Sequence, residues 1–281
     1  MKITFIGGGN MASALIAGLA GQLTDGANIH VVDPNAEQLA RLAASYKVTT
    51  APQIDAAAVN SDVIVLAVKP QQMREVASAL LAQLRQMGQI TGAASPPLLL
   101  SIAAGIRGAD LSRWLDGYGA IVRTMPNMPA LIGQGITGMV ALDGVSAAQK
   151  AAADDIMKAV GATVWLDDEA LIDPVTAVSG SGPAYVFYFI EAMQQAAQEL
   201  GLSAEQGKAL ALATFTGAAQ LAAQSPEQVS LLRERVTSKG GTTYAALTSM
   251  EQSGVKQAIV EAIKAASKRG RELGEELGGA L

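Results

Sequence analysis

Short apolar runs alternate with longer helical patterns in the first half of the chain. Between the first two runs, Met11, Leu15 and Leu19 recur at every fourth position and predict an amphipathic helix. Strands that are separated by helix-length segments form right-handed βαβ units, so the pattern predicts an α/β fold with an N-terminal, Rossmann-type doubly wound sheet. The runs that we interpret as strands cover residues 3–6, 29–32, 63–68, 98–102 and 120–123.

The pattern changes after about residue 165, where long segments rich in Ala, Leu, Gln and Glu follow. A helix is expected to begin at Pro183, and the next one starts with Ser203 and Gln206 at the spacing of a capping box. A further long helix closes the chain, and no strand is expected after Pro183. The sequence therefore predicts an α/β domain over residues 1–164 and an all-helical domain over residues 165–281.

The first predicted strand runs directly into a glycine-rich turn. Gly7, Gly9 and Ala12 match the G-x-G-x-x-G/A fingerprint of dinucleotide-binding folds, because a strand precedes them and a helix follows. Gly7 permits the tight turn, Gly9 lets the backbone approach a pyrophosphate, and Ala12 allows close packing of helix on strand. The pyrophosphate would be held by N–H groups at the start of the helix. The alternative is a flexible turn without a ligand. The remaining residues of this predicted site are Gly8, Asn10 and Met11.

Asp33 ends the next strand, 21 residues after Ala12. One interpretation is that its carboxylate accepts hydrogen bonds from the ribose hydroxyls of an adenosine, which favours NAD(H) and repels the 2′-phosphate of NADP(H). The other interpretation is a helix cap, since Asp33 and Pro34 look like the start of a helix. The choice between NAD and NADP stays open at this point.

Composition narrows the chemistry that the chain can carry. With no cysteine and one histidine in 281 residues, no disulfide and no metal site of Cys and His is expected. The net charge of −5 argues against a nucleic-acid partner. No apolar run reaches the roughly 18 residues of a membrane span, so we expect a cytoplasmic protein without a membrane partner. Chemistry must then depend on a cofactor, hydroxyls, backbone groups or carboxylates.

Four longer stretches resemble the pyrroline-5-carboxylate reductase family, in the right order and over essentially the whole chain. They are LAVKPQ (66–71), RTMPNMPALIGQGITGM (123–139), AVSGSGPAYVFYF (177–189) and LRERVTSKGGTTYAAL (232–247). An acid-sugar dehydrogenase would share the glycine loop but not the last two stretches. The resemblance implies hydride transfer from NAD(P)H to the C=N bond of 1-pyrroline-5-carboxylate, which gives L-proline in the last step of proline biosynthesis.

The resemblance also implies that three further segments line the cofactor, at strand ends where open sheets bind ligands. The alternatives left open are an ordinary strand exit for the first of these segments and a rigid turn for the last. The residues are Ala67, Val68, Lys69 and Pro70, then Ala103, Ala104 and Gly105 beside the nicotinamide ribose, and Asn127.

The substrate carboxylate is expected in the serine-, glycine- and threonine-rich loop near residue 240. Gly240 and Gly241 would leave N–H groups open, and the threonines would begin a helix, which makes an anion site without arginine. A glycine-rich turn with a threonine cap is the alternative. In the family that the chain resembles, many members carry proline at the position of Lys239, so the loop departs from the family pattern here. The resemblance assigns to the substrate Ser181, Ser238, Gly240, Gly241, Thr242 and Thr243, with Thr243 as the hydrogen-bond partner of the ring nitrogen.

This reaction can proceed without histidine, because a protonated imine is already electrophilic and the amine product takes up no further proton in that step. The helix AYVFYFIEAM is apolar nearly all round, which predicts a homodimer or a larger homo-oligomer unless one subunit buries it alone. Two rival functions are a similarly built reductase of another imine or of a 3-hydroxyacid, and a non-catalytic dinucleotide sensor. The loop near residue 240 favours the reductase, because a sensor has no use for it.

Overall fold

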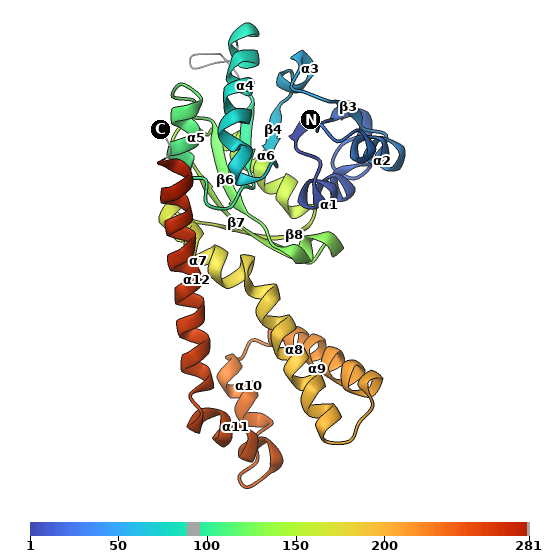
Figure 1. Cartoon of the computed structure of the whole chain (residues 1–281), viewed down its shortest axis with the longest axis vertical. Helices are drawn as coiled ribbons and strands as arrows, with labels where there is room; N and C mark the ends of the chain where they lie inside the picture. Colours follow the sequence, from blue (N-terminus) through green and yellow to red (C-terminus); the bar gives the residue numbers. More distant parts are fainter. Residues whose placement is uncertain (89–95, 280–281) are drawn as a thin grey trace. The chain divides into compact units, whose positions relative to one another are not determined.

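The computed structural model describes residues 1–88 and 96–279, and the strands of this part form one sheet (Figure 1). Their order is β3-β2-β1-β4-β5-β6-β7-β8, and all neighbours are parallel except β6 and β7. Sheet order reverses between β1 and β4, so the expected doubly wound α/β arrangement is confirmed. The bounds are β1 Ile3–Ile6, β2 Ile29–Val32, β3 Thr49–Ala51, β4 Val63–Leu66, β5 Leu98–Ser101, β6 Ile121–Met125, β7 Gly135–Ala141 and β8 Gly161–Trp165.

All five predicted strands are present, although β4 and β5 each end before the last predicted residue. Three strands were not predicted. β3 is a short strand with two exposed threonines, β7 is a continuous strand whose apolar residues are broken up by Thr137 and Gly138, and β8 is a half-exposed strand at the end of the sheet. None of these has the continuous apolar run that marks the buried central strands.

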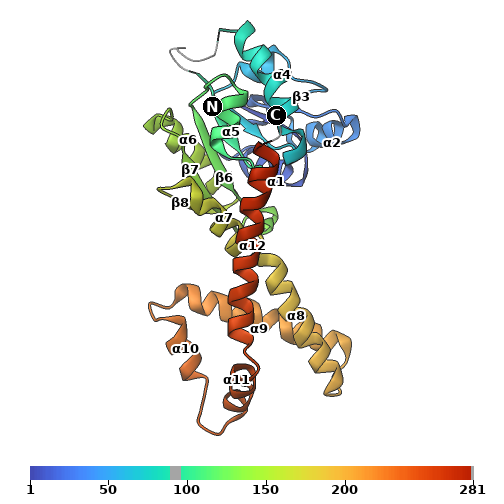
Figure 2. The same ribbon diagram turned by 60° about the vertical axis from the view of Figure 1, so that its left-hand side comes forward.

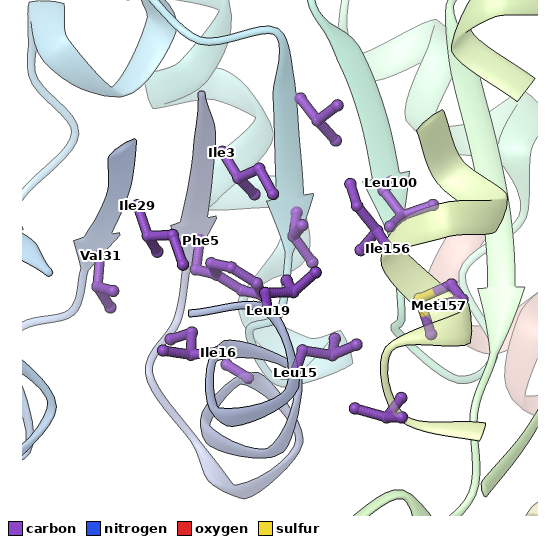
Figure 3. Packing of buried hydrophobic residues seen from close by; sticks show 14 of the residues in the cluster. Ile3, Phe5, Leu15, Ile16, Leu19, Ile29, Val31, Leu100, Ile156 and Met157 are labelled. Carbon is purple, nitrogen blue, oxygen red and sulfur yellow. The ribbon is translucent and has the colours of Figure 1, made fainter. Parts of the chain in front are cut away.

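Helices cover both faces of the sheet. On one face, Ile3 and Phe5 of β1 pack with Leu15 of α1 and Ile156 of α6 (Figure 3). On the other, Ile6 packs in a second cluster that α4 and α5 complete. Because successive side chains of β1 point to opposite faces of the sheet, this strand contributes to both hydrophobic cores. These helices are α1 Asn10–Leu19, α2 Ala36–Tyr46, α3 Ala56–Val59, α4 Met73–Gln86, α5 Gly108–Trp114, α6 Ala147–Lys158 and α7 Ile172–Val175.

The remaining helices are α8 Gly182–Glu199, α9 Ala204–Gln224, α10 Val229–Arg235, α11 Thr242–Gln252 and α12 Val255–Gly278. The predicted capping box of Ser203 and Gln206 begins α9. In the described part of the chain, no helix has the length and apolarity needed to cross a membrane.

The chain forms two compact units, which we call the α/β unit and the helical unit. The α/β unit contains residues 1–181 and the end of the chain from Ala266, whereas the helical unit contains Gly182–Ala265. The last turns of α12 thus pack within the α/β unit. That residues 1–164 bind the dinucleotide and residues 165–281 bind the substrate and form the dimer stays a prediction.

Candidate functional site

The carboxyl ends of β1, β2 and β4 surround a cleft of about 590 Å³ in the α/β unit. This is the switch point of the sheet, where open α/β sheets bind their ligands. Of the residues that the sequence assigns to a cofactor, the structure brings together at this cleft Gly7, Gly9, Asp33, Ala67, Val68 and Lys69.

Gly7 occupies a position that other residues do not fit. Its φ is +102°, and a Cβ there would lie 2.6 Å from the carbonyl oxygen of Ala67. Its N–H donates to the carbonyl of Val32 at 2.8 Å. The glycine therefore allows the β1–α1 turn to pass close to the exit of β4, as predicted from its place in the fingerprint.

Gly9 precedes α1 and leaves space for a ligand. A Cβ on Gly9 would meet nothing within 4 Å, and no side chain caps the helix at this residue. The first N–H groups of α1, including those of Asn10 and Met11, therefore lack an intrahelical acceptor and a cap. Ala12 is buried, as expected for close packing of α1 on the sheet. A cradle of this kind fits a pyrophosphate.

Gly8 is held from both sides by side chains. Its N–H donates to Asp33 Oδ2 at 2.7 Å, and its carbonyl accepts hydrogen bonds from Gln38 Nε2 and Ser13 Oγ. Gln38 Nε2 also lies 3.1 Å from Ser13 Oγ. Gln38 was not predicted from the sequence. The one signal that could have identified it is its position in the first turn of the helix that follows Asp33. The glycine loop is thus anchored to α2.

Asp33 is not the cap of α2. The N-cap is Asn35, whose side chain accepts the N–H of Gln38 at 3.2 Å. Asp33 instead accepts the N–H of Asn35 through Oδ1 at 2.8 Å and that of Gly8 through Oδ2. The interpretation of Asp33 as the N-cap of this helix is therefore wrong. Each carboxylate oxygen keeps a second acceptor position, which is compatible with ribose hydroxyls.

The charges around the cleft are few. Among the described residues that line it, Lys69 is the one cation, and Asp33 and Glu75 are the two acids. Lys69 is exposed and precedes the 3₁₀ turn η2 (Pro70–Gln72), so Pro70 begins that turn rather than lining the cleft.

The segment after β5 lies beside the exit of β4. Leu66 pairs with Ser101, and the N–H of Ile102 donates to the carbonyl of Leu66 at 3.2 Å. Ala103 and Gly105 are buried, Ala104 is half-buried, and Gly105 has a φ of +74°. These residues do not line the cleft itself, so their predicted contact with the nicotinamide ribose stays a prediction.

Asn127 and Ser181 both make internal hydrogen bonds. Asn127 Nδ2 donates to the carbonyl of Ser179 at 3.1 Å, and its Oδ1 accepts the N–H of Ile136 at 2.9 Å. The Ser181 N–H donates to Thr176 at 2.8 Å across a π-helical turn (Thr176–Gly180). Both residues have structural functions, and their predicted ligand contacts stay predictions.

The loop from Ser238 to Thr243 belongs to the helical unit, where it leads into α11. Gly240 has a φ of +77°, but the N–H of Gly241 donates to the Ser238 carbonyl at 3.0 Å. The expectation that Gly241 leaves its N–H open is therefore wrong, because the turn closes on itself. The free N–H groups are those at the start of α11, which follows directly. Thr242 and Thr243 begin this helix, and no side chain caps it.

A cavity of about 310 Å³ adjoins this loop within the helical unit. Its lining carries two cations, Arg233 and Lys239, and two acids, Glu234 and Glu251. Lys239 therefore contributes a positive charge beside the start of α11, where a proline would contribute none.

Family models match both parts of the chain. The model described as pyrroline-5-carboxylate reductase dimerisation matches residues 169–273. The model described as NADP oxidoreductase, coenzyme F420-dependent, matches residues 2–91, which contain the glycine loop and Asp33.

Whole-chain relatives agree with these matches. The pyrroline-5-carboxylate reductase of Pseudomonas aeruginosa is 46% identical over 99% of this chain and 98% of its own. A solved pyrroline-5-carboxylate reductase structure from Coxiella burnetii superimposes with a TM-score of 0.88 at 37% identity, covering 97% of this chain and 98% of that one. The Plasmodium falciparum pyrroline carboxylate reductase, solved with NADP bound, has a TM-score of 0.83 at 29% identity and covers 98% of each chain.

Proposed function

We propose that this chain, which belongs to the pyrroline-5-carboxylate reductase family, reduces 1-pyrroline-5-carboxylate to L-proline. The observation that carries the proposal is the glycine cradle at the switch point, together with whole-chain similarity to reductases of this name. The free N–H groups at the start of α1, Asp33 and the exit of β4 would hold a nicotinamide dinucleotide. When bound, this cofactor supplies the hydride that reduces the imine carbon, which is C2 of 1-pyrroline-5-carboxylate and becomes C5 of proline.

The residues of the chain then have to orient the substrate and neutralise its carboxylate. A protonated imine accepts hydride at its C=N carbon, and the electron pair of the C=N bond moves to nitrogen, so no acid has to deliver a proton. N–H groups and hydroxyls are sufficient for such a site, since positioning supplies most of the catalysis. The uncapped start of α11, with the hydroxyls of Thr242 and Thr243, has the donors that a small carboxylate needs.

The direct test is the initial rate of NADH and NADPH oxidation with 1-pyrroline-5-carboxylate, measured beside its six-membered ring homologue and a 3-hydroxyacid with the oxidised cofactor. We expect turnover of the five-membered imine to exceed the others. Binding of the dinucleotide without turnover of this imine would reject the proposed substrate and leave the fold standing.

Thr243 is our assignment for the hydrogen bond to the ring nitrogen. A hydrogen bond to a charged group contributes about 1.5–3 kcal/mol, so Thr243→Ala should lower kcat/KM by roughly 10- to 100-fold. Thr248→Ala is the matched control, because Thr248 lies on the same helix and lines the adjoining cavity. An unchanged kcat/KM in Thr243→Ala would remove Thr243 from the mechanism.

Asp33 leads us to propose NADH as the preferred cofactor. A 2′-phosphate near Asp33 would meet a carboxylate, and the one cation among the described lining residues, Lys69, lies in the segment after β4 and not in the Asp33 loop. Repulsion between like charges makes NADH bind at least about tenfold more tightly than NADPH.

Fluorescence titration of both dinucleotides tests this preference. Asp33→Ser should narrow the NADH/NADPH affinity ratio, whereas Gln38→Ala should weaken both dinucleotides alike, because Gln38 holds Gly8 without a charge. A ratio that stays the same in Asp33→Ser would show that Asp33 serves only to anchor the loop.

We also propose a homodimer that forms through the helical unit, which lies within the segment matched by the dimerisation model. A cytoplasmic location stays a prediction, as do the contacts of Ser181, Ser238 and Asn127 with ligands.

A further inference from the structure

The end of α12 carries three glycines at every fourth position, and all of them face other parts of the α/β unit. A Cβ on Gly270 would lie 3.5 Å from Asp173 Oδ1, an ordinary contact. A Cβ on Gly274 would lie 3.3 Å from the carbonyl oxygen of Gly105, which is tight. On Gly278 it would collide with the Asp110 carboxylate. The helix backbone thus approaches the α/β unit so closely that side chains are excluded toward its end.

Gly105 is in turn closely packed against side chains of α12. A Cβ on Gly105 would lie 3.4 Å from both Leu273 Cβ and Leu277 Cδ1. Gly105 is buried and has a left-handed φ of +74°, a conformation that glycine adopts without strain. Leu273, Gly274 and Leu277 therefore pack directly against the turn that contains Gly105.

Ionic hydrogen bonds fix the end of the helix in place. Arg113 donates to the carbonyl of Gly278 at 2.6 Å, where a cation is favourable at a helix C-terminus. Arg113 also donates to Asp110 at 3.0 Å, and Arg107 donates to Asp110 at 2.7 Å. Asp110 is only 2% exposed. The red end of α12 lies beside α5, which carries Asp110 and Arg113, in both views (Figures 1 and 2).

The turn that α12 encloses follows β5, beside the β4 exit that lines the cofactor cleft. We propose that the end of α12 is a positioning element for the nicotinamide half of the cofactor, acting through Gly274 on the Ala103–Gly105 turn. This proposal rests on the proposed function, because it takes the dinucleotide as the ligand of the cleft and places its nicotinamide beside Ala103–Gly105, past the exit of β4. In the proposed function, the adenosine and the pyrophosphate would bind at Asp33 and at the glycine loop, which the described residues of α12 do not contact.

Paired titrations separate the two halves of the cofactor. NADH and ADP-ribose, which lacks the nicotinamide, are titrated by calorimetry into the full-length protein and its variants. Gly274→Ala should weaken NADH about five- to tenfold and lower kcat by a similar factor, because small misplacements of a reacting group are costly. ADP-ribose affinity should stay within about twofold of the wild type.

Gly270→Ala is the matched control, since it adds the same methyl group to the same helix at a site with ordinary contacts. It should change neither affinity. Leu277→Ala serves as a second variant that removes atoms from the Gly105 contact, and it should repeat the pattern of Gly274→Ala.

Equal weakening of NADH and ADP-ribose in step with a lower Tm would overturn the proposal and leave α12 a purely structural support. Unchanged affinity for both ligands in Gly274→Ala and Leu277→Ala would overturn it as well. A wild-type protein that binds NADH but does not reduce the imine would reject the proposed substrate, and the affinity comparison would still test the effect of α12.

Discussion

The α/β unit and the helical unit bury their apolar side chains to very different extents. Two apolar clusters fill both faces of the sheet in the α/β unit. In the helical unit, only Ile190 and Ala211 are buried apolar side chains. Large apolar side chains stand exposed instead, including Phe187, Tyr188, Leu210, Leu221, Val229 and Val236.

This difference indicates that the units are stabilised by different means. A sheet covered on both faces has its own core, whereas a helix with exposed aromatic side chains lacks a partner surface. The pair Phe189 and Phe215 is the one aromatic contact described, with ring centroids 6.5 Å apart. These exposed side chains support the proposed homodimer, in which a second copy would complete the core of the helical unit, and the dimerisation model matches this segment.

Tryptophan fluorescence can follow the α/β unit by itself, because both tryptophans, Trp114 and Trp165, lie in that unit. Sedimentation velocity reports the oligomeric state, so the two measurements together distinguish loss of the α/β fold from dissociation of the proposed dimer.

The largest effect is expected from Phe5→Ala, since Phe5 is fully buried at the centre of the first core (Figure 3). Removing a buried phenylalanine costs about 3–5 kcal/mol of unfolding free energy. The tryptophan midpoint in urea should fall while the folded protein stays a dimer. Dissociation of the folded protein by this substitution would show that the two units are not separately stabilised.

Tyr188→Asp should act in the opposite way. Tyr188 is 72% exposed within one chain, so the α/β unit does not depend on it. Loss of a central aromatic contact at an interface costs roughly 2–4 kcal/mol, which raises the dimer Kd by about 30- to 1,000-fold. Sedimentation velocity at low micromolar concentration should show monomers with an unchanged tryptophan midpoint.

The control for this substitution is Leu23→Asp, which adds the same charge at an exposed apolar residue of the α/β unit. It should leave the dimer intact. A Tyr188→Asp protein that stays dimeric would move the interface away from this face of α8.

The same contrast explains how much of the molecule could be predicted from sequence. Apolar runs such as 63–66 identify central strands because both of their faces are buried, whereas β3 and β8 lie at the ends of the sheet and carry exposed residues. The glycine cradle was predictable because the tight turn requires glycine at position 7 and the approach of a ligand requires it at position 9, and this spacing is visible in the sequence. Gln38 was not, since its bond to the Gly8 carbonyl depends on how α2 packs. The closed N–H of Gly241 likewise depends on the turn that the loop adopts.

The smallest expected effect comes from two capping boxes that differ only in the unit that holds them. Ser146 with Gln149 begins α6 in the α/β unit, and Ser203 with Gln206 begins α9 in the helical unit. Replacing an N-cap serine by alanine costs about 1 kcal/mol. Ser146→Ala should lower the tryptophan midpoint and leave the dimer Kd unchanged. Ser203→Ala should leave that midpoint unchanged and raise the dimer Kd about fivefold, because the helical unit is stabilised through its partner. Equal shifts of the tryptophan midpoint in both variants would mean that the two units unfold as one.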